Sequence, residues 1–292
     1  MTTEPLVTYT FDVEAGQVRR FAEAAWDPRS TAPGPLGLPL TYLGAAPSLA
    51  GRPHSLRAMG FDVARAFHGT EEVEVLAPVG AGDSLTVQEG VHALPSVAGR
   101  RGGTMRRAER RCTFLTHTGE TVARTHRVIL ETAAPLTAST SGGGSRPFDD
   151  GLDAHPVPRG LDAVRTGHEW GPASFGPLTL TDFVRYAAAS ADLTAIHFDE
   201  LAAASRGYPG PFAMGMLSAA FLGTCLDTWL TPEPPWRVSV RFQDLVWPGE
   251  TLTISARAVG QSYRAECRAG ARVVTTADLT LGLPQPAEAD PR

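Results

Sequence analysis

The clearest pattern in the chain is an alternation of hydrophobic and polar residues that occurs twice. Residues 72–91, EVEVLAPVGAGDSLTVQEGV, and residues 238–259, VSVRFQDLVWPGETLTISARAV, each contain two alternating segments joined by a turn. The turns contain Gly82 and Gly249, each followed by an acidic residue, and such pairs favour tight reversals of the chain. Alternation with a period of two predicts strands with one buried face. The repetition therefore predicts two similar halves built mainly from antiparallel strands.

Helical patterns precede the strands in each half. FAEAAWD (21–27) matches YAAASAD (186–192), and both read as an amphipathic turn of helix that ends in Asp. Residues 213–230 are apolar on nearly all sides, and such a helix must be covered on most of its surface. A curved antiparallel sheet wrapped around one helix supplies that cover, which is the hotdog architecture. The fold class predicted is α+β, with two hotdogs in one chain.

The boundary between the halves is predicted from composition. Residues 132–160 are dominated by Gly, Pro, Ser, Thr and Asp and have no periodicity. They indicate an N-terminal domain over 1–132, a linker over 133–159 and a C-terminal domain over 160–292. Because an isolated hotdog leaves a sheet edge exposed, the two halves are expected to form an internal pseudo-dimer.

Composition and charge exclude several classes of function. The chain has 292 residues, of which 42% are hydrophobic and 20% charged, and this suits a soluble globular protein with a real core. A net charge of -5 gives no sign of a nucleic-acid partner. All 26 basic residues are Arg, so a Schiff-base or P-loop lysine is ruled out. The apolar stretch 213–230 contains Asp227 and two glycines, and it is interpreted as a buried helix rather than a membrane span.

Cysteine usage bears on the compartment. Cys112, Cys225 and Cys267 are far apart and have no metal-binding spacing. Their odd number, together with a polar start that lacks the apolar core of a signal peptide, predicts a cytoplasmic protein.

The most informative stretch for chemistry is FGPLTLTDFVRYAAASADLTAIHFDELAAASRGYPGPFAMGMLSAAFL, residues 175–222. It resembles the signature of the MaoC-like dehydratases and (R)-specific enoyl-CoA hydratases. The matching residues are Asp192, His197, Asp199, Glu200, Ala202, Gly207, Tyr208, Gly215, Met216 and Leu217. Residues 68–85 and 99–105 resemble the degenerate N-terminal hotdog of two-domain members. The family pattern usually has Asn-Pro where this chain has Thr194-Ala195, and often His or Pro where it has Met214.

The resemblance implies a reaction and a set of catalytic residues. Adding water to a 2-enoyl thioester needs a base, an acid and donors for the charge on the thioester oxygen. By resemblance, Asp192 and His197 bind the water, and Gly215 at the start of the long helix supplies the oxyanion donor. The expected activity interconverts trans-2-enoyl and (R)-3-hydroxyacyl thioesters of coenzyme A or an acyl carrier protein, as in fatty acid metabolism. No cofactor, metal, nucleic acid or membrane partner is expected, and a homodimer of double hotdogs is possible.

Two other functions stay open at this stage. A hotdog thioesterase would attack the carbonyl carbon instead of Cβ. A non-catalytic subunit would use the same fold to bind acyl groups and complete the pocket of another protein.

The remaining polar residues have simpler interpretations. Asp27 occupies the place of Asp192 in the repeat, but it has no companion His and is expected to be a helix-end or turn residue. The other histidines, His68 among them, are expected to be surface or structural residues. A group of arginines could meet the phosphates of coenzyme A, although a solvated hairpin face is favoured; its members are Arg100, Arg101, Arg106, Arg107, Arg110 and Arg111. Segment 35–62 is rich in Pro and Gly, so a loosened helix is expected there, with room for a bulky or long acyl chain.

Overall fold

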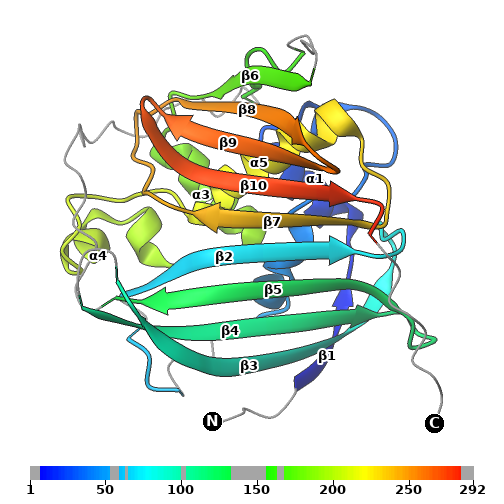
Figure 1. The fold of residues 1–292 in the computed structure, drawn as a ribbon, viewed down its shortest axis with the longest axis horizontal. Coiled ribbons are helices and arrows are strands. Elements are labelled where there is room, and N and C mark those ends of the chain that lie inside the picture. The colour runs from blue at the N-terminus through cyan, green and yellow to red at the C-terminus, as the bar shows by residue number, and fades with distance from the viewer. Residues whose placement is uncertain are drawn as a thin grey trace.

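One antiparallel sheet of ten strands runs through the whole protein, and the helices cover one of its faces (Figure 1). The computed structural model describes residues 7–52, 59–62, 65–99, 103–132, 156–162 and 168–283. The strand order is β1-β3-β4-β5-β2-β7-β10-β9-β8-β6, so each half of the chain supplies five adjacent strands. The α+β double-hotdog prediction is confirmed.

The N-terminal half ends with two very short helices followed by four long strands. Its elements are β1 (Val7–Asp12), α1 (Ala15–Ala24), η1 (Pro28–Thr31), η2 (Tyr42–Ala45), α2 (Ala46–Leu49), β2 (Ala66–Val75), β3 (Ser84–Ala98), β4 (Thr104–Leu115) and β5 (Thr121–Glu131).

The C-terminal half follows the same order with a much longer central helix. Its elements are β6 (Glu169–Phe175), α3 (Leu180–Ser190), η5 (Ala195–His197), α4 (Glu200–Ala204), α5 (Gly215–Leu230), β7 (Trp236–Phe242), β8 (Leu252–Val259), β9 (Ser262–Ala269) and β10 (Arg272–Leu281).

The two halves join where β2 pairs with β7 in the middle of the sheet. Val73 lies opposite Val238 in this register, and both are buried. On the outer face Glu74 binds Arg237 of the other half at 2.6 Å and Arg124 of its own half at 3.0 Å. The joint therefore has apolar packing on one side and an ionic contact on the other.

The internal repeat extends to backbone detail. Gly82 and Gly249 both have a positive φ, 101° and 86°, which explains why glycine occupies the two turns. The amide of Gly82 donates to the carbonyl of Val13, and that of Gly249 donates to Leu178, at the equivalent point after the first strand of its half. However, the strands that flank each turn are not neighbours, since β2 pairs with β5 and β7 while β3 pairs with β1 and β4.

Helix α5 is the centre of the core, as its apolar sequence predicts. Every residue from Met216 to Asp227 is buried. Phe221 stacks on Phe175 of β6 with ring centroids 4.5 Å apart and contacts Trp26 of the N-terminal half at 5.7 Å. No helix in the described residues has the length and hydropathy needed to cross a bilayer.

The N-terminal half has no equivalent of α5 in its described residues. Between Tyr42 and Leu49 the chain forms only η2 and α2, and residues 53–58 and 63–64 lie outside the described residues. Most of the predicted linker, residues 133–155, also lies outside them. Arg159 exchanges two backbone hydrogen bonds with Ser174 beside β6. The division into domains at 133–159 stays a prediction.

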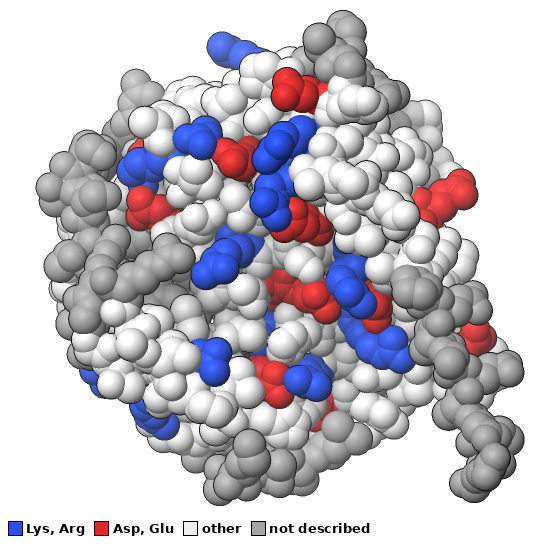
Figure 2. Space-filling model, in the orientation of Figure 1, with Lys and Arg blue, Asp and Glu red and all other residues white. Residues whose placement is uncertain are grey.

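The open face of the sheet carries charges of both signs in close pairs. Figure 2 shows basic and acidic side chains interleaved across it. Arg264 binds Asp278 at 2.7 Å, Arg268 binds Glu266 at 2.8 Å and Glu109 accepts from Arg111 at 3.0 Å. Among the described residues on this face, charges of both signs therefore alternate, without a large area of one sign.

Candidate active site

Asp192 lies on the turn that leaves α3. The helix begins with a capping box between Thr179 and Asp182, and it ends at Ala191, whose φ of 55° is left-handed. This reversal presents Asp192 at the end of the helix. Its Oδ1 accepts hydrogen bonds from the amide of Thr194 at 3.3 Å and from the Thr194 hydroxyl at 2.7 Å. The orientation of the carboxylate is therefore set by the residue two positions further on.

His197 ends the short η5 turn, and one bond determines its tautomer. Nδ1 lies 2.8 Å from the carbonyl oxygen of Phe212, and a carbonyl can only accept. The proton is therefore on Nδ1, which donates, and Nε2 carries the lone pair in the neutral ring. The ring of Phe212 packs against the imidazole edge-on at 5.1 Å. Because Phe212 precedes α5 by three residues, this contact brings His197 close to the start of that helix.

The protonation state of His197 follows from its burial. The side chain is nearly enclosed, and burial lowers the pKa of His197 below its ordinary value of 6.5, although the charge of Asp192 acts in the opposite direction. The imidazole is therefore neutral at pH 7. Asp192 and His197 both lie in the segment between α3 and α4, and the charge of Asp192 acts on the ring.

Gly215 is the first residue of α5, where backbone amides lack partners within the helix. A Cβ at this position would lie 2.9 Å from Cδ1 of Phe242 on β7, closer than such atoms approach in proteins. The glycine is needed because the phenyl ring packs directly against the helix start. The ring of Phe242 also stacks on the imidazole of His68, with ring centroids 5.1 Å apart.

Asp199 and Tyr208, two further residues of the motif, have structural contacts within this part of the fold. Asp199 caps α4 by accepting from the amide of Ala202 at 2.7 Å. A small apolar cluster, separate from the main core, lies between η5, α4 and the chain before α5 and consists of Ile196, Ala203, Tyr208, Phe212 and Trp247. Phe212 belongs to this cluster and contacts His197, so the packing of the cluster fixes the side of the imidazole that faces Phe212.

Thr194, at a position where the family pattern usually has Asn, binds the Asp192 carboxylate through its hydroxyl. We expect Thr194→Val, which keeps the side-chain shape but removes the hydroxyl, to lower kcat roughly tenfold through loss of one hydrogen bond to a charged group. Steady-state kinetics on an enoyl thioester measure this. Thr194→Ser should restore most of the rate, and an unchanged kcat in the Val variant would contradict the positioning role.

Asp27 is the structural counterpart of Asp192. Trp26 before it has a φ of 54°, matching Ala191, and the amide of Arg29 donates to Asp27 Oδ1 at 2.9 Å as Thr194 does to Asp192. Asp27 caps η1, so the expectation of a helix-end residue is confirmed. Its carboxylate is only 2% exposed and binds the Arg29 guanidinium, which also binds Asp227 of α5 at 2.5 Å. Arg29 therefore links the Asp27 carboxylate to α5 of the other half.

Asp27→Asn is therefore expected to affect stability and leave the chemistry intact. Loss of one charge from the buried Asp27–Arg29–Asp227 bridge should lower the free energy of unfolding by about 1–3 kcal/mol. Urea denaturation measures this change, and kcat per folded molecule should stay at the wild-type value. A fall in kcat without a change in stability would give Asp27 a catalytic role that the structure does not support.

A second polar cluster borders the site, and it comes from the N-terminal half. His68 Nε2 lies 3.2 Å from Glu71 Oε2, and Arg127 Nε binds the same oxygen at 2.5 Å. Arg127 also donates to the carbonyl of Gly44 at 2.7 Å. His68 is thus half-buried, stacked on Phe242 and next to Glu71, and of the two roles expected for it, surface or structural, it fits the structural one. A β-bulge between His68 and Thr70 turns both His68 and Glu71 toward the interior.

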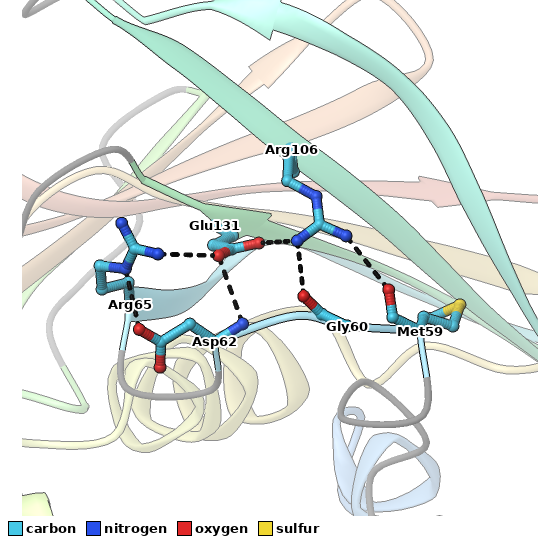
Figure 3. A network of polar contacts seen from close by, with 6 residues as sticks. All are labelled: Met59, Gly60, Asp62, Arg65, Arg106 and Glu131. Carbon is cyan, nitrogen blue, oxygen red and sulfur yellow. Dashed lines mark hydrogen bonds and ion pairs between the residues drawn. The ribbon is translucent and has the colours of Figure 1, made fainter.

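The described members of the arginine group have partners within the chain. Arg106 donates to Glu131 at 2.8 Å and to the carbonyls of Met59 and Gly60 (Figure 3). Arg107 donates to Pro95, Arg110 lies 3.3 Å from Glu89, and Arg111 binds Glu109. Arg100 and Arg101 lie outside the described residues.

The network in Figure 3 fixes the chain that leads into β2. Glu131 accepts from Arg65 at 3.3 Å and from the amide of Asp62 at 3.2 Å, besides Arg106. These bonds attach the segment before β2 to the end of β5. They therefore hold the start of β2, and with it His68, in place.

The fold and the site together define a double-hotdog protein with an Asp-His pair beside the amino end of its central helix. Residues 167–278 match the family model described as MaoC like domain, and residues 1–125 match the one described as FAS1-like, dehydratase domain region. The C-terminal half therefore contains a MaoC-like domain, and the N-terminal half contains a region similar to a dehydratase domain. A comparison with curated proteins finds no match.

Solved structures show the same fold along nearly the whole chain. HtdX of Mycobacterium tuberculosis is 20% identical with a TM-score of 0.67, and the match covers 94% of this chain and 99% of HtdX. A MaoC-like dehydratase from Phytophthora capsici is 18% identical with a TM-score of 0.70 and 95% coverage of both chains. Rv0216 of Mycobacterium tuberculosis, described as having a double hotdog fold, is 15% identical with a TM-score of 0.55 and coverages of 95% and 96%.

Proposed function

We propose that the chain hydrates trans-2-enoyl thioesters and, in the reverse direction, dehydrates (R)-3-hydroxyacyl thioesters. The acyl carrier is coenzyme A or an acyl carrier protein. The observation that carries this proposal is the tautomer of His197. Since Nδ1 donates to Phe212, the Nε2 lone pair is available beside the Asp192 carboxylate, and a water bound between an acceptor nitrogen and a carboxylate is ready to lose a proton.

The proposed reaction balances with these groups alone. The water oxygen bonds to Cβ, the π electrons move to Cα, and negative charge develops on the thioester oxygen. The Asp192–His197 pair takes one proton from the water and returns one to Cα. The amide at Gly215, at the positive end of the α5 dipole, stabilises the oxyanion in the transition state. Dehydration is the same path reversed.

Incubation with crotonyl-CoA tests the proposal and separates the alternatives. Loss of the enoyl absorbance without release of free thiol is the expected result. Release of thiol would indicate a thioesterase. No reaction, together with retained binding of the thioester, would indicate a non-catalytic acyl-binding subunit.

Two further parts of the proposal concern the protein's surroundings. We propose a cytoplasmic location, which agrees with three buried cysteines that are free thiols. A homodimer of double hotdogs is proposed as the assembly, and sedimentation equilibrium would show a mass of two chains if it forms.

A further inference from the structure

The backbone of Gly215, the first residue of α5, is held by contacts from both halves of the chain. Gly215 is half-buried, whereas Met214 and Met216 on either side of it are buried, so the helix start is accessible at the glycine. The Ser218 hydroxyl donates to the Gly215 carbonyl at 2.7 Å and lies 2.6 Å from the Thr275 hydroxyl of β10. Because a carbonyl only accepts, Ser218 gives its proton to Gly215 and accepts from Thr275. The C-terminal half thus fixes the carbonyl of the glycine.

The ring of Phe242, at the end of β7, makes a second contact with Gly215. Its atoms Cδ1, Cε1 and Cγ would lie 2.9–3.3 Å from a Cβ at Gly215, so the ring faces the α-carbon of the glycine. Phe242 is the direct partner of Thr275 in the register of β7 with β10. This pairing fixes the backbone of Phe242, but the direction of its side chain depends on what packs against the ring.

The residue that packs against this ring is His68 of the N-terminal half. His68 lies on β2, the strand that pairs with β7 (Figure 1), and the two rings stack with centroids 5.1 Å apart and planes 24° apart. His68 Nε2 lies 3.2 Å from Glu71 Oε2, and Arg127 Nε binds the same oxygen at 2.5 Å. A series of direct contacts therefore connects this buried ion pair to Gly215.

The same ion pair is also connected to the second residue of α5. Arg127 donates to the carbonyl of Gly44 at 2.7 Å. A Cβ on Gly44 would lie 2.9 Å from Glu71 Oε1 and 3.3 Å from the methyl carbon of Met216. A buried ion pair adds little net stability, because the cost of removing two charges from water offsets their attraction. Its contacts with the start of α5 favour a role in positioning that turn.

We propose that His68 is a positioning residue for the oxyanion donor. Glu71 holds the imidazole, the imidazole fixes the ring of Phe242, and the ring fixes the direction in which the Gly215 amide points. The inference rests on the proposed function, in which this amide stabilises the thioester oxyanion. The N-terminal half thereby acts on the reaction through one stacking contact, although the acid–base pair belongs to the other half.

Variants of His68 separate the effect of a flat ring from that of volume. In His68→Leu, kcat for hydration of crotonyl-CoA should fall about tenfold with little change in KM, because a displaced donor weakens stabilisation of the transition state. His68→Phe keeps a ring for stacking and should restore most of the rate. His126→Leu is the matched control and should keep the wild-type kcat, since His126 Nε2 lies 2.9 Å from Glu109 Oε2 in a His–Glu pair of the same half, with 36% of its side chain exposed.

A double-variant cycle tests whether His68 acts through Phe242. Phe242→Leu should lower kcat as His68→Leu does, and the double variant should be little slower than either single variant, because one removes the contact on which the other depends. Effects that multiply would show that His68 acts by another route and would overturn the inference. A His68→Leu variant with the wild-type kcat, or with only KM raised, would overturn it as well.

The Gly215 amide can also be followed without turnover, by nuclear magnetic resonance. Selective isotope labelling of the Met carbonyl carbon and the Gly amide nitrogen isolates two amides, because the chain has Met-Gly pairs at residues 59–60 and 214–215. The Gly215 signal should shift in His68→Leu, return towards its wild-type position in His68→Phe and stay in place in His126→Leu. The signal from the other pair is the internal reference and should not move.

This second measurement distinguishes failure of the inference from failure of the proposed function. If the wild type does not hydrate crotonyl-CoA, the proposed function fails, and the amide signal still tests the contact. A Gly215 signal that moves in His68→Leu and returns in His68→Phe would support positioning by His68. A signal that stays in place in both variants would refute it, whether or not the protein is active.

Discussion

Asp192→Asn and His197→Ala are each expected to lower kcat for enoyl-thioester hydration at least about 100-fold, since each removes one acid–base partner of the same water. The structure supports a shared role because His197 presents Nε2 while Thr194 orients the Asp192 carboxylate. The double variant should be little slower than either single variant, because groups that act as a unit are not additive. Stopped assays at saturating substrate measure these effects, and circular dichroism checks that the variants are folded.

The internal repeat supplies a matched control for this prediction. Asp27→Asn is the same chemical change at the equivalent turn of the other half, where no His follows. It should leave kcat unchanged while it lowers stability. His117→Ala, in the exposed turn between β4 and β5, is the control for His197. Near-full activity in Asp192→Asn or in His197→Ala would remove that residue from the mechanism.

Gly215→Ala is expected to lower kcat by roughly 10²-fold, the range seen when an oxyanion donor is lost, with a smaller change in KM. The added methyl would lie 2.9 Å from the ring of Phe242, so either the ring or the helix start must move. Movement of the ring also displaces His68, which stacks on it. The amide that receives the thioester oxygen would then be misplaced in the transition state.

Gly223→Ala in the same helix is the control for Gly215. A Cβ there would meet Leu40 and Thr41 at 3.6–3.9 Å, which is ordinary contact. Stability should rise slightly because Ala favours a helix interior over Gly. Kinetics on both variants separate the two cases, and a Gly215→Ala variant with raised KM and intact kcat would contradict the oxyanion role.

Much of the site could be predicted from the sequence because its spacing is local. Asp192 and His197 belong to one loop, and Gly215 opens the long helix α5, so a motif of 24 residues contains all three. The long helix is likewise predicted by its continuous apolar sequence. The two strand modules are predicted by their alternation of apolar and polar residues. The sequence also distinguishes Asp27 from the candidate catalytic residue Asp192, because no His follows Asp27 at the matching position.

The partners of these residues could not be predicted in the same way. The two strands of each module read as a connected pair, yet β2 and β3 lie apart in the sheet, because β5 and β4 are inserted between them. The substitution of Thr194 for the usual Asn looks like a loss in the sequence, whereas its hydroxyl binds Asp192 directly. Only the turn geometry shows this.

The position of the His68 side chain is the clearest example of a feature that only the tertiary structure could show. Strict alternation would place His68 and Glu71, three positions apart, on opposite faces of β2. The bulge at Gly69 adds one residue to the strand and turns both side chains inward. A Cβ at Gly69 would meet Leu130 at 3.0 Å, so the close packing of β5 favours glycine there.

By itself, the sequence determined the class of fold, the repeat and the candidate catalytic loop, because periodicity and short spacings are properties of neighbouring residues. The tertiary structure decided which half supplies each wall of the site. Arg127 on β5 meets Glu71 on β2 across a separation of 56 residues, and Glu74 on β2 meets Arg237 of the other half. Contacts of that kind depend on strand order and on a single bulge, and neither leaves a periodic pattern in the chain.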